Sequence, residues 1–330
     1  MNTNHIVYDL RVLPPTFDFL GFVVVARTLQ LAQNNFASES ALNLTVINPC
    51  QGELLRPKEF STEDTLSIVS ERIYGLILPV CRLLPYLKDV EVVSSNNIGK
   101  CGLNFYDNVL FPLGYNPNNP ALYRYYKGHM LLEAAKSRDI RDIVVPEEAK
   151  KKARAYLGSM GLKPGAFVLV ALRTNSDSLD RSRDTNAEWL RQLTIALQAE
   201  GIPMLILADR LESYMIETLV SDTPHAVIDN ALSMDPVFRA AAYETAAFCI
   251  FGASGNSSVG YLNRNTKFAY TGMTVGKTFT DEWHIRQGWK RNFNHFSPDS
   301  DSQFFYWDYP PVGSLLNIIS ANLILGGLKN

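Results

Sequence analysis

Four short segments in the second half of the chain are apolar at almost every position, and each ends in polar or small residues. They are FVLVALR (167–173), IPMLILAD (202–209), FCIFGA (248–253) and KFAYTG (267–272). Segments with helical periodicity lie between them, as at residues 186–201. Strands that are apolar on both faces and alternate with helices are typical of a parallel sheet covered by helices on both sides. We therefore predict an α/β fold for this half.

The first half opens with the same kind of unit. HIVYDL (5–10) and LNLTVINP (42–49) are predicted strands, and residues 16–35 between them are a predicted helix. A strand–helix–strand unit of this length implies parallel pairing. Both halves are thus predicted to be Rossmann-like domains, facing each other across a cleft.

The pattern changes between residues 140 and 165, so we place the domains at 1–150 and 151–330, the second ending in an apolar helix. Residues 51–140 give weaker signals. YGLILPV (74–80) and NVLFPLGY (108–115) are the candidate strands there.

Composition limits the partners. The 330 residues carry 31 Lys and Arg against 33 Asp and Glu, a net charge of −2, which does not suit a surface for nucleic acid. The four cysteines form no CxxC pair, as expected in a reducing compartment. No signal peptide and no membrane-spanning run is evident, so we expect a cytoplasmic protein, with peripheral membrane contact still compatible. Without a G-x-G-x-x-G motif, NAD binding has no support, and no cofactor or metal is expected.

The turn FGASGNSSVG (251–260) joins a predicted strand to a predicted helix. Its small residues allow close approach of a ligand, and backbone N–H groups at a helix start attract anions. The candidate anion-binding residues are Ser254, Gly255, Asn256, Ser257 and Ser258. The alternative is a serine N-cap after a tight turn.

A second polar cluster follows the strand that ends at Arg173. Arg173, Asn175 and Arg183 lie in one loop, and several guanidinium groups there would suit a diphosphate. The alternative is a solvated loop whose charges pair with one another. Asp209, after the next strand, is a candidate acceptor for a ribose or base, and helix capping is the alternative role.

Three residues are candidates for acid–base chemistry. Asp9 and Asp18 flank the loop after the first strand, where a carboxylate could deprotonate an acceptor hydroxyl. Asp18 equally suits the first turn of a helix, where the dipole favours a negative charge. His284 could titrate near neutral pH, although a histidine beside Trp283 and Trp289 also suits a structural role.

Taken together, the segments 167–193, 201–209 and 248–272 resemble GT-B glycosyltransferases, in the heptosyltransferase and fucosyltransferase-like branch that includes bacterial putative glycosyltransferases. The shared features are an Arg after the first strand of the second domain and a Gly-Ser turn after its fourth strand. The chain departs at ALRTNSD (171–177), where fucosyltransferases typically carry a His-x-Arg-Arg motif, so the donor identity is not carried over.

The resemblance implies metal-independent transfer of a sugar from a nucleotide-diphosphate sugar to an acceptor hydroxyl. It implies that Ser254 to Ser258 bind the diphosphate and that Arg173 stabilises the leaving nucleotide. The first domain would bind the acceptor, which is a glycan, a lipid-linked molecule or a small molecule. Two alternatives stay open: a nucleotide-sugar epimerase or hydrolase on the same scaffold, and a non-catalytic two-lobed protein that binds a phosphorylated ligand.

Overall fold

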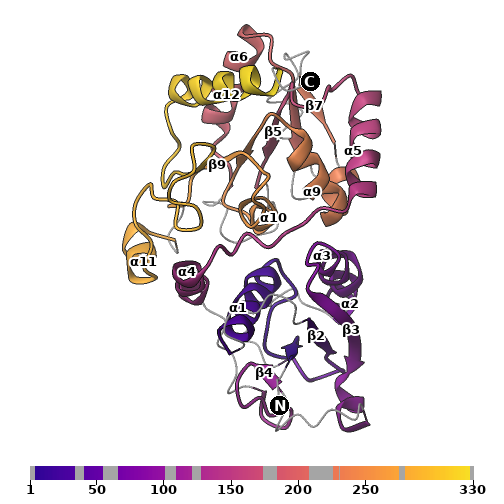
Figure 1. The fold of residues 1–330 in the computed structure, drawn as a ribbon. Coiled ribbons are helices and arrows are strands. Elements are labelled where there is room, and N and C mark those ends of the chain that lie inside the picture. The colour runs from indigo at the N-terminus through magenta and orange to yellow at the C-terminus, as the bar shows by residue number, and fades with distance from the viewer. Residues whose placement is uncertain are drawn as a thin grey trace. The chain divides into compact units, whose positions relative to one another are not determined.

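The structure is a computed structural model that describes residues 4–33, 41–54, 66–100, 109–120, 128–173, 184–207, 226–229, 231–274 and 279–327. The chain divides into two compact units, Met1–Val144 and Val145–Asn330. The sequence predicts this boundary after residue 150. Each unit contains one sheet, and each is described by itself below (Figure 1).

The sheet of unit 1 has four parallel strands in the order β3-β2-β1-β4. Its strands are β1 (His5–Asp9), β2 (Leu42–Asn48), β3 (Leu87–Ser94) and β4 (Val109–Phe111). Helix α1 (Asp18–Gln33) connects β1 to β2, so the predicted strand–helix–strand unit is confirmed. The remaining described helices are α2 (Leu66–Arg72), the π-helix η2 (Ile73–Ile77), α3 (Leu78–Cys81), the 3₁₀-helix η3 (Ser95–Lys100) and α4 (Gly128–Ser137).

The predicted strand at residues 74–80 is wrong, because this segment is helical. Ile73, Ile77 and Val80 are the buried residues of the segment, and their spacing is that of one helix face. The N–H of Leu78 donates to the carbonyl of Ile73, which gives the wider π-helical turn. The strand that the prediction missed is β3, an edge strand whose exposed residues include Lys88 and Glu91.

The sheet of unit 2 has six parallel strands in the order β10-β9-β8-β5-β6-β7. Its strands are β5 (Val168–Ala171), β6 (Met204–Leu207), β7 (Ala226–Ile228), β8 (Phe248–Phe251), β9 (Phe268–Tyr270) and β10 (Gln303–Phe305). The described helices are α5 (Glu147–Ser159), α6 (Ala187–Ala199), α8 (Ala231–Met234), α9 (Pro236–Thr245), α10 (Ser257–Tyr261), α11 (Asp281–Arg286) and α12 (Val312–Gly327). The parallel sheet predicted for this half is therefore confirmed.

Helices cover both faces of this second sheet (Figure 1). All four residues of β5, β6 and β8 are buried, which explains their uninterrupted apolar sequence. Leu315 and Ile319 of the C-terminal helix α12 belong to the same core cluster as Leu193 of α6. On the opposite face, Tyr243 of α9 packs against the ring of Phe251.

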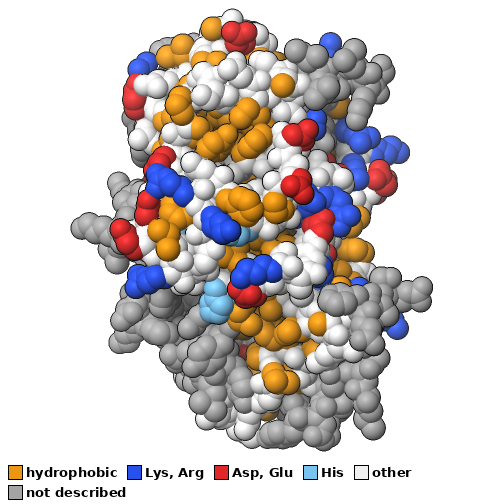
Figure 2. Space-filling view, turned by 60° about the vertical axis from the view of Figure 1, so that its left-hand side comes forward, with side chains coloured by type: hydrophobic (Ala, Val, Ile, Leu, Met, Phe, Trp, Pro, Cys, Tyr) orange, Lys and Arg blue, Asp and Glu red, His pale blue; other side chains and the backbone are white. Residues whose placement is uncertain are grey.

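Within the described residues, no helix combines the length and the apolar character needed to cross a membrane. Figure 2 shows the face of unit 2 that carries α11 and α12, where basic, acidic and hydrophobic side chains are interspersed. No large area of a single charge is visible on this face.

Candidate functional site

The strand order of unit 2 marks one position as a ligand site. From β5 the chain builds the sheet outward through β6 to β7, and from β8 it builds in the other direction through β9 to β10. The order therefore reverses between β5 and β8, whose last residues, Ala171 and Phe251, are register partners. Ligands of open α/β sheets bind at the carboxyl ends of the strands at such a reversal. Two predicted site segments, at Arg173 and at Ser254, follow these two strands.

Gly252 lets the two segments approach closely. Its N–H donates to the carbonyl of Ala171 at 3.0 Å. A Cβ atom on residue 252 would lie 3.0 Å from Thr185 Oγ1 and 3.4 Å from the backbone nitrogen of Arg173. A Cβ atom here would make unusually tight contacts, so glycine favours this packing, and the Ser-rich turn lies directly beside the end of β5.

The backbone of Arg173 is held by two hydrogen bonds with Thr185, while its side-chain Nε donor has no hydrogen-bond acceptor among the described residues. Its N–H donates to Thr185 Oγ1 at 3.1 Å, and the N–H of Thr185 donates to the Arg173 carbonyl at 3.0 Å. The Nε atom is buried and has no hydrogen-bond partner among the described residues, and it forms a long ion pair with Asp184 Oδ1 at 3.9 Å. A buried guanidinium N–H normally has an acceptor, so this atom can serve an added anion.

Within the Ser-rich turn, two hydroxyl groups point inward. Ser257 Oγ donates to the carbonyl of Gly252 at 2.8 Å, and Ser258 Oγ donates to the carbonyl of Gly255 at 2.7 Å. Their N–H groups also donate within the turn, to Ser254 and Gly255. In this structure these donors close the turn and start α10, and a ligand contact of Ser257 and Ser258 stays a prediction.

The donors that the turn does not use belong to Ser254 and Gly255. The Ser254 hydroxyl is buried without a hydrogen-bond partner among the described residues. Gly255 is exposed, and its N–H donates to no described residue. Asn256 is half-buried directly after them. Among the predicted anion-binding residues in the described part of the chain, Arg173, Ser254 and Gly255 therefore have donors to offer.

Three predicted residues, Asn175, Arg183 and Asp209, lie outside the described residues. Thr185 is a further residue of this region that was not predicted. Its hydroxyl accepts a hydrogen bond from the N–H of Arg173, and residues 174–183 between the two are outside the described part of the chain. No local sequence signal marks that contact.

His284 lies in an aromatic cluster with a packing role. It is 6% exposed, its Nε2 atom is 3.0 Å from the carbonyl of Met273, and its ring contacts Trp283 and Trp307. Since a carbonyl can only accept, Nε2 carries the proton. Burial lowers the pKa of His284, opposed by the hydrogen bond to Met273, so the ring is neutral near pH 7. The Nδ1 atom is buried and has no hydrogen-bond partner among the described residues, and the acid–base role of His284 stays a prediction.

The two aspartates of unit 1 have different surroundings. Asp9 is 1% exposed and accepts hydrogen bonds from the backbone and guanidinium of Arg11 and from the Tyr115 hydroxyl. Burial and these three partners favour a structural role for Asp9, and its role as a general base stays a prediction. Asp18 is exposed at the start of α1, where Thr16 Oγ1 donates to its carboxylate at 3.0 Å.

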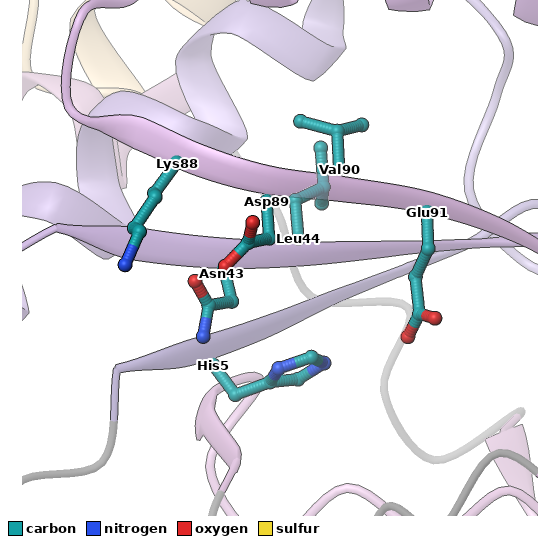
Figure 3. A pocket seen from close by; sticks show the side chains of 7 residues that line it. All are labelled: His5, Asn43, Leu44, Lys88, Asp89, Val90 and Glu91. Carbon is teal, nitrogen blue, oxygen red and sulfur yellow. The ribbon is translucent and has the colours of Figure 1, made fainter.

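A polar groove of about 570 Å³ lies near the amino ends of β1 and β2 (Figure 3). Buried Thr45 donates to Glu91 Oε1 at 2.6 Å and lies 2.8 Å from His5 Nε2. Because the hydroxyl proton goes to the carboxylate, Thr45 accepts from the imidazole. The groove occupies the strand ends opposite to those that bind ligands in such sheets, so it is not the candidate site.

No known family matches the sequence, and no curated protein sequence matches it. Among solved structures, a glycosyl transferase family 9 protein from Veillonella parvula DSM 2008 aligns over 98% of this chain and 99% of its own, with a TM-score of 0.53 and 12% identity. The chain shares the fold of that glycosyltransferase. The expected resemblance to GT-B glycosyltransferases is confirmed at the level of the fold.

Two further structures align with lower scores. ADP-heptose lps heptosyltransferase II from E. coli aligns over 97% of this chain and 98% of its own, with a TM-score of 0.49 and 11% identity. POFUT1 in complex with GDP-fucose aligns over 83% and 99%, with a TM-score of 0.41 and 10% identity. Scores at this level support no statement about the site.

Proposed function

We propose that this chain is a glycosyltransferase that moves a sugar from a nucleotide-diphosphate sugar to an acceptor hydroxyl. The observation that carries the proposal is a pair of buried donors, Arg173 Nε and Ser254 Oγ, that lack acceptors among the described residues. They follow the two strands between which the order of the sheet reverses. Buried donors without acceptors at a ligand-binding edge favour an anionic ligand. The fold shared with the Veillonella glycosyltransferase favours a sugar nucleotide as that anion.

In this proposal unit 2 binds the donor. The Arg173 guanidinium neutralises part of the diphosphate charge, and Ser254 Oγ and the Gly255 N–H donate to phosphate oxygens. Negative charge grows on the leaving nucleotide as the sugar–oxygen bond breaks, so fixed donors stabilise the transition state more than the ground state. Asn175, Arg183, Asn256 and Asp209 stay predicted donor-site residues.

Unit 1 supplies the acceptor side. Asp18 is exposed at the first position of α1, in the connection that follows β1, so we assign it the role of general base. It would take the proton of the acceptor hydroxyl while that oxygen bonds to the anomeric carbon. The acceptor is a glycan, a lipid-linked molecule or a small molecule. We place the activity in the cytoplasm.

Arg173 also supports a metal-independent reaction, because it supplies the positive charge that a divalent ion would otherwise bring to the diphosphate. On this proposal, turnover with EDTA equals turnover without it. A strict requirement for added magnesium or manganese would contradict this part of the proposal.

The deciding experiment is a thermal-shift panel of nucleotides and nucleotide sugars. We expect one nucleoside diphosphate and its sugar to raise the unfolding midpoint of the parent, because a ligand that binds only the folded state stabilises it. Arg173→Ala should lose this shift, and Arg191→Ala should keep it, since Arg191 is an exposed residue of α6 paired with Glu188. A parent protein that no nucleotide stabilises would refute the donor site. Consumption of the sugar nucleotide without an acceptor would indicate a hydrolase instead.

A further inference from the structure

Three buried side chains of unit 1 form one connected polar group: Asp9, Arg11 and Tyr115. The Arg11 guanidinium donates to both carboxylate oxygens of Asp9, with Nη2 at 2.7 Å from Oδ2. The Tyr115 hydroxyl donates to the same Oδ2 atom at 2.6 Å. Arg11 also donates to the carbonyl of Pro117 at 2.9 Å. This trio joins residues that lie about a third of the chain apart, and the site described above uses none of them.

The trio lies where the order of the first sheet reverses. The chain builds from β1 through β2 to β3 on one side, and β4 is added on the other side of β1. Asp9 ends β1, and Tyr115 and Pro117 follow β4. The trio therefore ties the loop after β1 to the segment after β4, at the position where such a sheet binds its ligand.

The same loop leads directly to Asp18, and its backbone is anchored from the start. The N–H groups of Val12 and Leu13 donate to the carbonyl of Asp9 at 3.1 and 2.8 Å, and the Tyr8 hydroxyl donates to the carbonyl of Pro14 at 2.6 Å. Thr16 then donates to the Asp18 carboxylate. The direction of the loop at residue 9 thus fixes where α1, and Asp18 at its first position, begin.

We propose that Asp9, Arg11 and Tyr115 are positioning residues that hold the loop of residues 10–17 so that the Asp18 carboxylate meets the acceptor hydroxyl. This inference rests on the proposed function, in which Asp18 is the general base. A general base acts only within hydrogen-bond reach of the proton that it removes, so a loop free to move lowers the fraction of time in reactive geometry.

Arg11 and Tyr115 both keep their protons near neutral pH, because the pKa of each is raised. Burial alone would lower the pKa of Arg11, but its hydrogen bonds to Asp9 and the carboxylate charge outweigh burial and raise it. Burial and the neighbouring Asp9 charge raise the pKa of Tyr115, so the hydroxyl keeps its proton. Arg11 therefore stays charged and Tyr115 stays a hydrogen-bond donor across the neutral pH range.

The test compares two tyrosines whose hydroxyl groups each donate a hydrogen bond to an aspartate carboxylate. Tyr115→Phe removes the 2.6 Å hydrogen bond to Asp9, and the control Tyr156→Phe removes a 2.6 Å hydrogen bond to Asp229 in unit 2. Hydrogen exchange of the backbone amides of residues 10–13 reports on the loop directly, without any substrate. We expect about tenfold faster exchange at these amides in Tyr115→Phe and no change there in Tyr156→Phe, because one hydrogen bond to a charged group is lost.

Steady-state kinetics give the second readout. In Tyr115→Phe, kcat should fall about tenfold, while KM for the donor and the affinity for the nucleoside diphosphate stay at parent values. Arg11→Lys keeps the charge but loses the bidentate contact with Asp9, so its kcat should lie between those of the parent and Tyr115→Phe. Loop exchange and kcat equal to the parent in Tyr115→Phe would overturn the inference. A parent that binds no nucleotide would instead refute the proposed function, and the exchange comparison would still decide whether the trio holds the loop.

Discussion

Gly260 of α10 lies so close to the ring of Phe251 that a Cβ atom on residue 260 would be 2.2 Å from Phe251 Cζ. Phe251 ends β8 and Gly260 lies in α10, so this contact packs α10 against the strand that positions the candidate anion site. The ring is itself held by Tyr243 and Phe268, which limits its ability to move aside.

Gly260→Ala should therefore lower the free energy of unfolding by about 1–3 kcal/mol, the usual cost of overpacking a buried site. Urea unfolding measures this directly. Gly158→Ala is the matched control, since Gly158 also lies in a helix but a Cβ there meets nothing within 4 Å. The control should be unchanged or more stable by up to about 1 kcal/mol. Equal stability of the two variants would show that the Phe251 ring relaxes freely.

Arg173→Ala should weaken binding of the nucleoside diphosphate by about 1.5–3 kcal/mol, the range for hydrogen bonds to charged groups. Its unfolding midpoint without ligand should stay close to that of the parent, because the removed Nε atom has no hydrogen-bond partner among the described residues. Titration calorimetry gives the affinity, with Arg191→Ala as the charge-matched control. Parent-like affinity in a folded Arg173→Ala variant would assign the residue to structure.

The two serines Ser254 and Ser257 should respond in opposite ways. Ser257→Ala removes the hydrogen bond to Gly252, so it should cost about 1 kcal/mol of stability. Ser254→Ala removes a hydroxyl that makes no hydrogen bond to a described residue, so its stability should be unchanged while nucleotide binding weakens. Unfolding curves and titrations on the two variants make the comparison. Loss of stability in Ser254→Ala would reveal a partner for its hydroxyl within the protein.

Acidification should destabilise the fold through His284. Burial lowers its pKa in the folded protein below the ordinary value of 6.5, so the unfolded chain binds more protons between these two values. His284 therefore costs the fold no stability above about pH 7, and the free energy of unfolding decreases as the pH falls below about 6.5. His284→Gln should lose less stability than the parent between about pH 7 and 5, measured by urea unfolding. The exposed His129 of α4 provides the control His129→Gln, which should follow the parent.

Much of unit 2 could be predicted because its central strands are buried on both faces and so are apolar without interruption, as at Val168–Ala171. The turn at Ser254 and the arginine at position 173 could be placed at strand ends for the same reason. The sequence could not show which turn hydroxyls bond to the backbone, because that depends on where α10 begins and on where each side chain points.

Other features depend on contacts that no local pattern contains. The short edge strand β10 has only three residues, too few to show a period. The sequence cannot show that Asp9 is hydrogen-bonded to Tyr115, because the two residues meet only through the pairing of β1 with β4. In residues 74–80, an apolar run suited both a strand and a helix, and the burial of Ile77 and Val80 on one face is a tertiary outcome.

The central position of β5 also has a consequence for biosynthesis. In the described sheet β5 pairs with β6 on one side and with β8 on the other. The second edge of β5 therefore stays unpaired until β8, including Phe251, has left the ribosome. Until then the nascent chain exposes a fully apolar strand with unpaired N–H and C=O groups, which is a template for association with other chains. Because such distant pairing makes folding slow, this edge of β5 stays open at least until the whole chain from β5 to β8 has been synthesised.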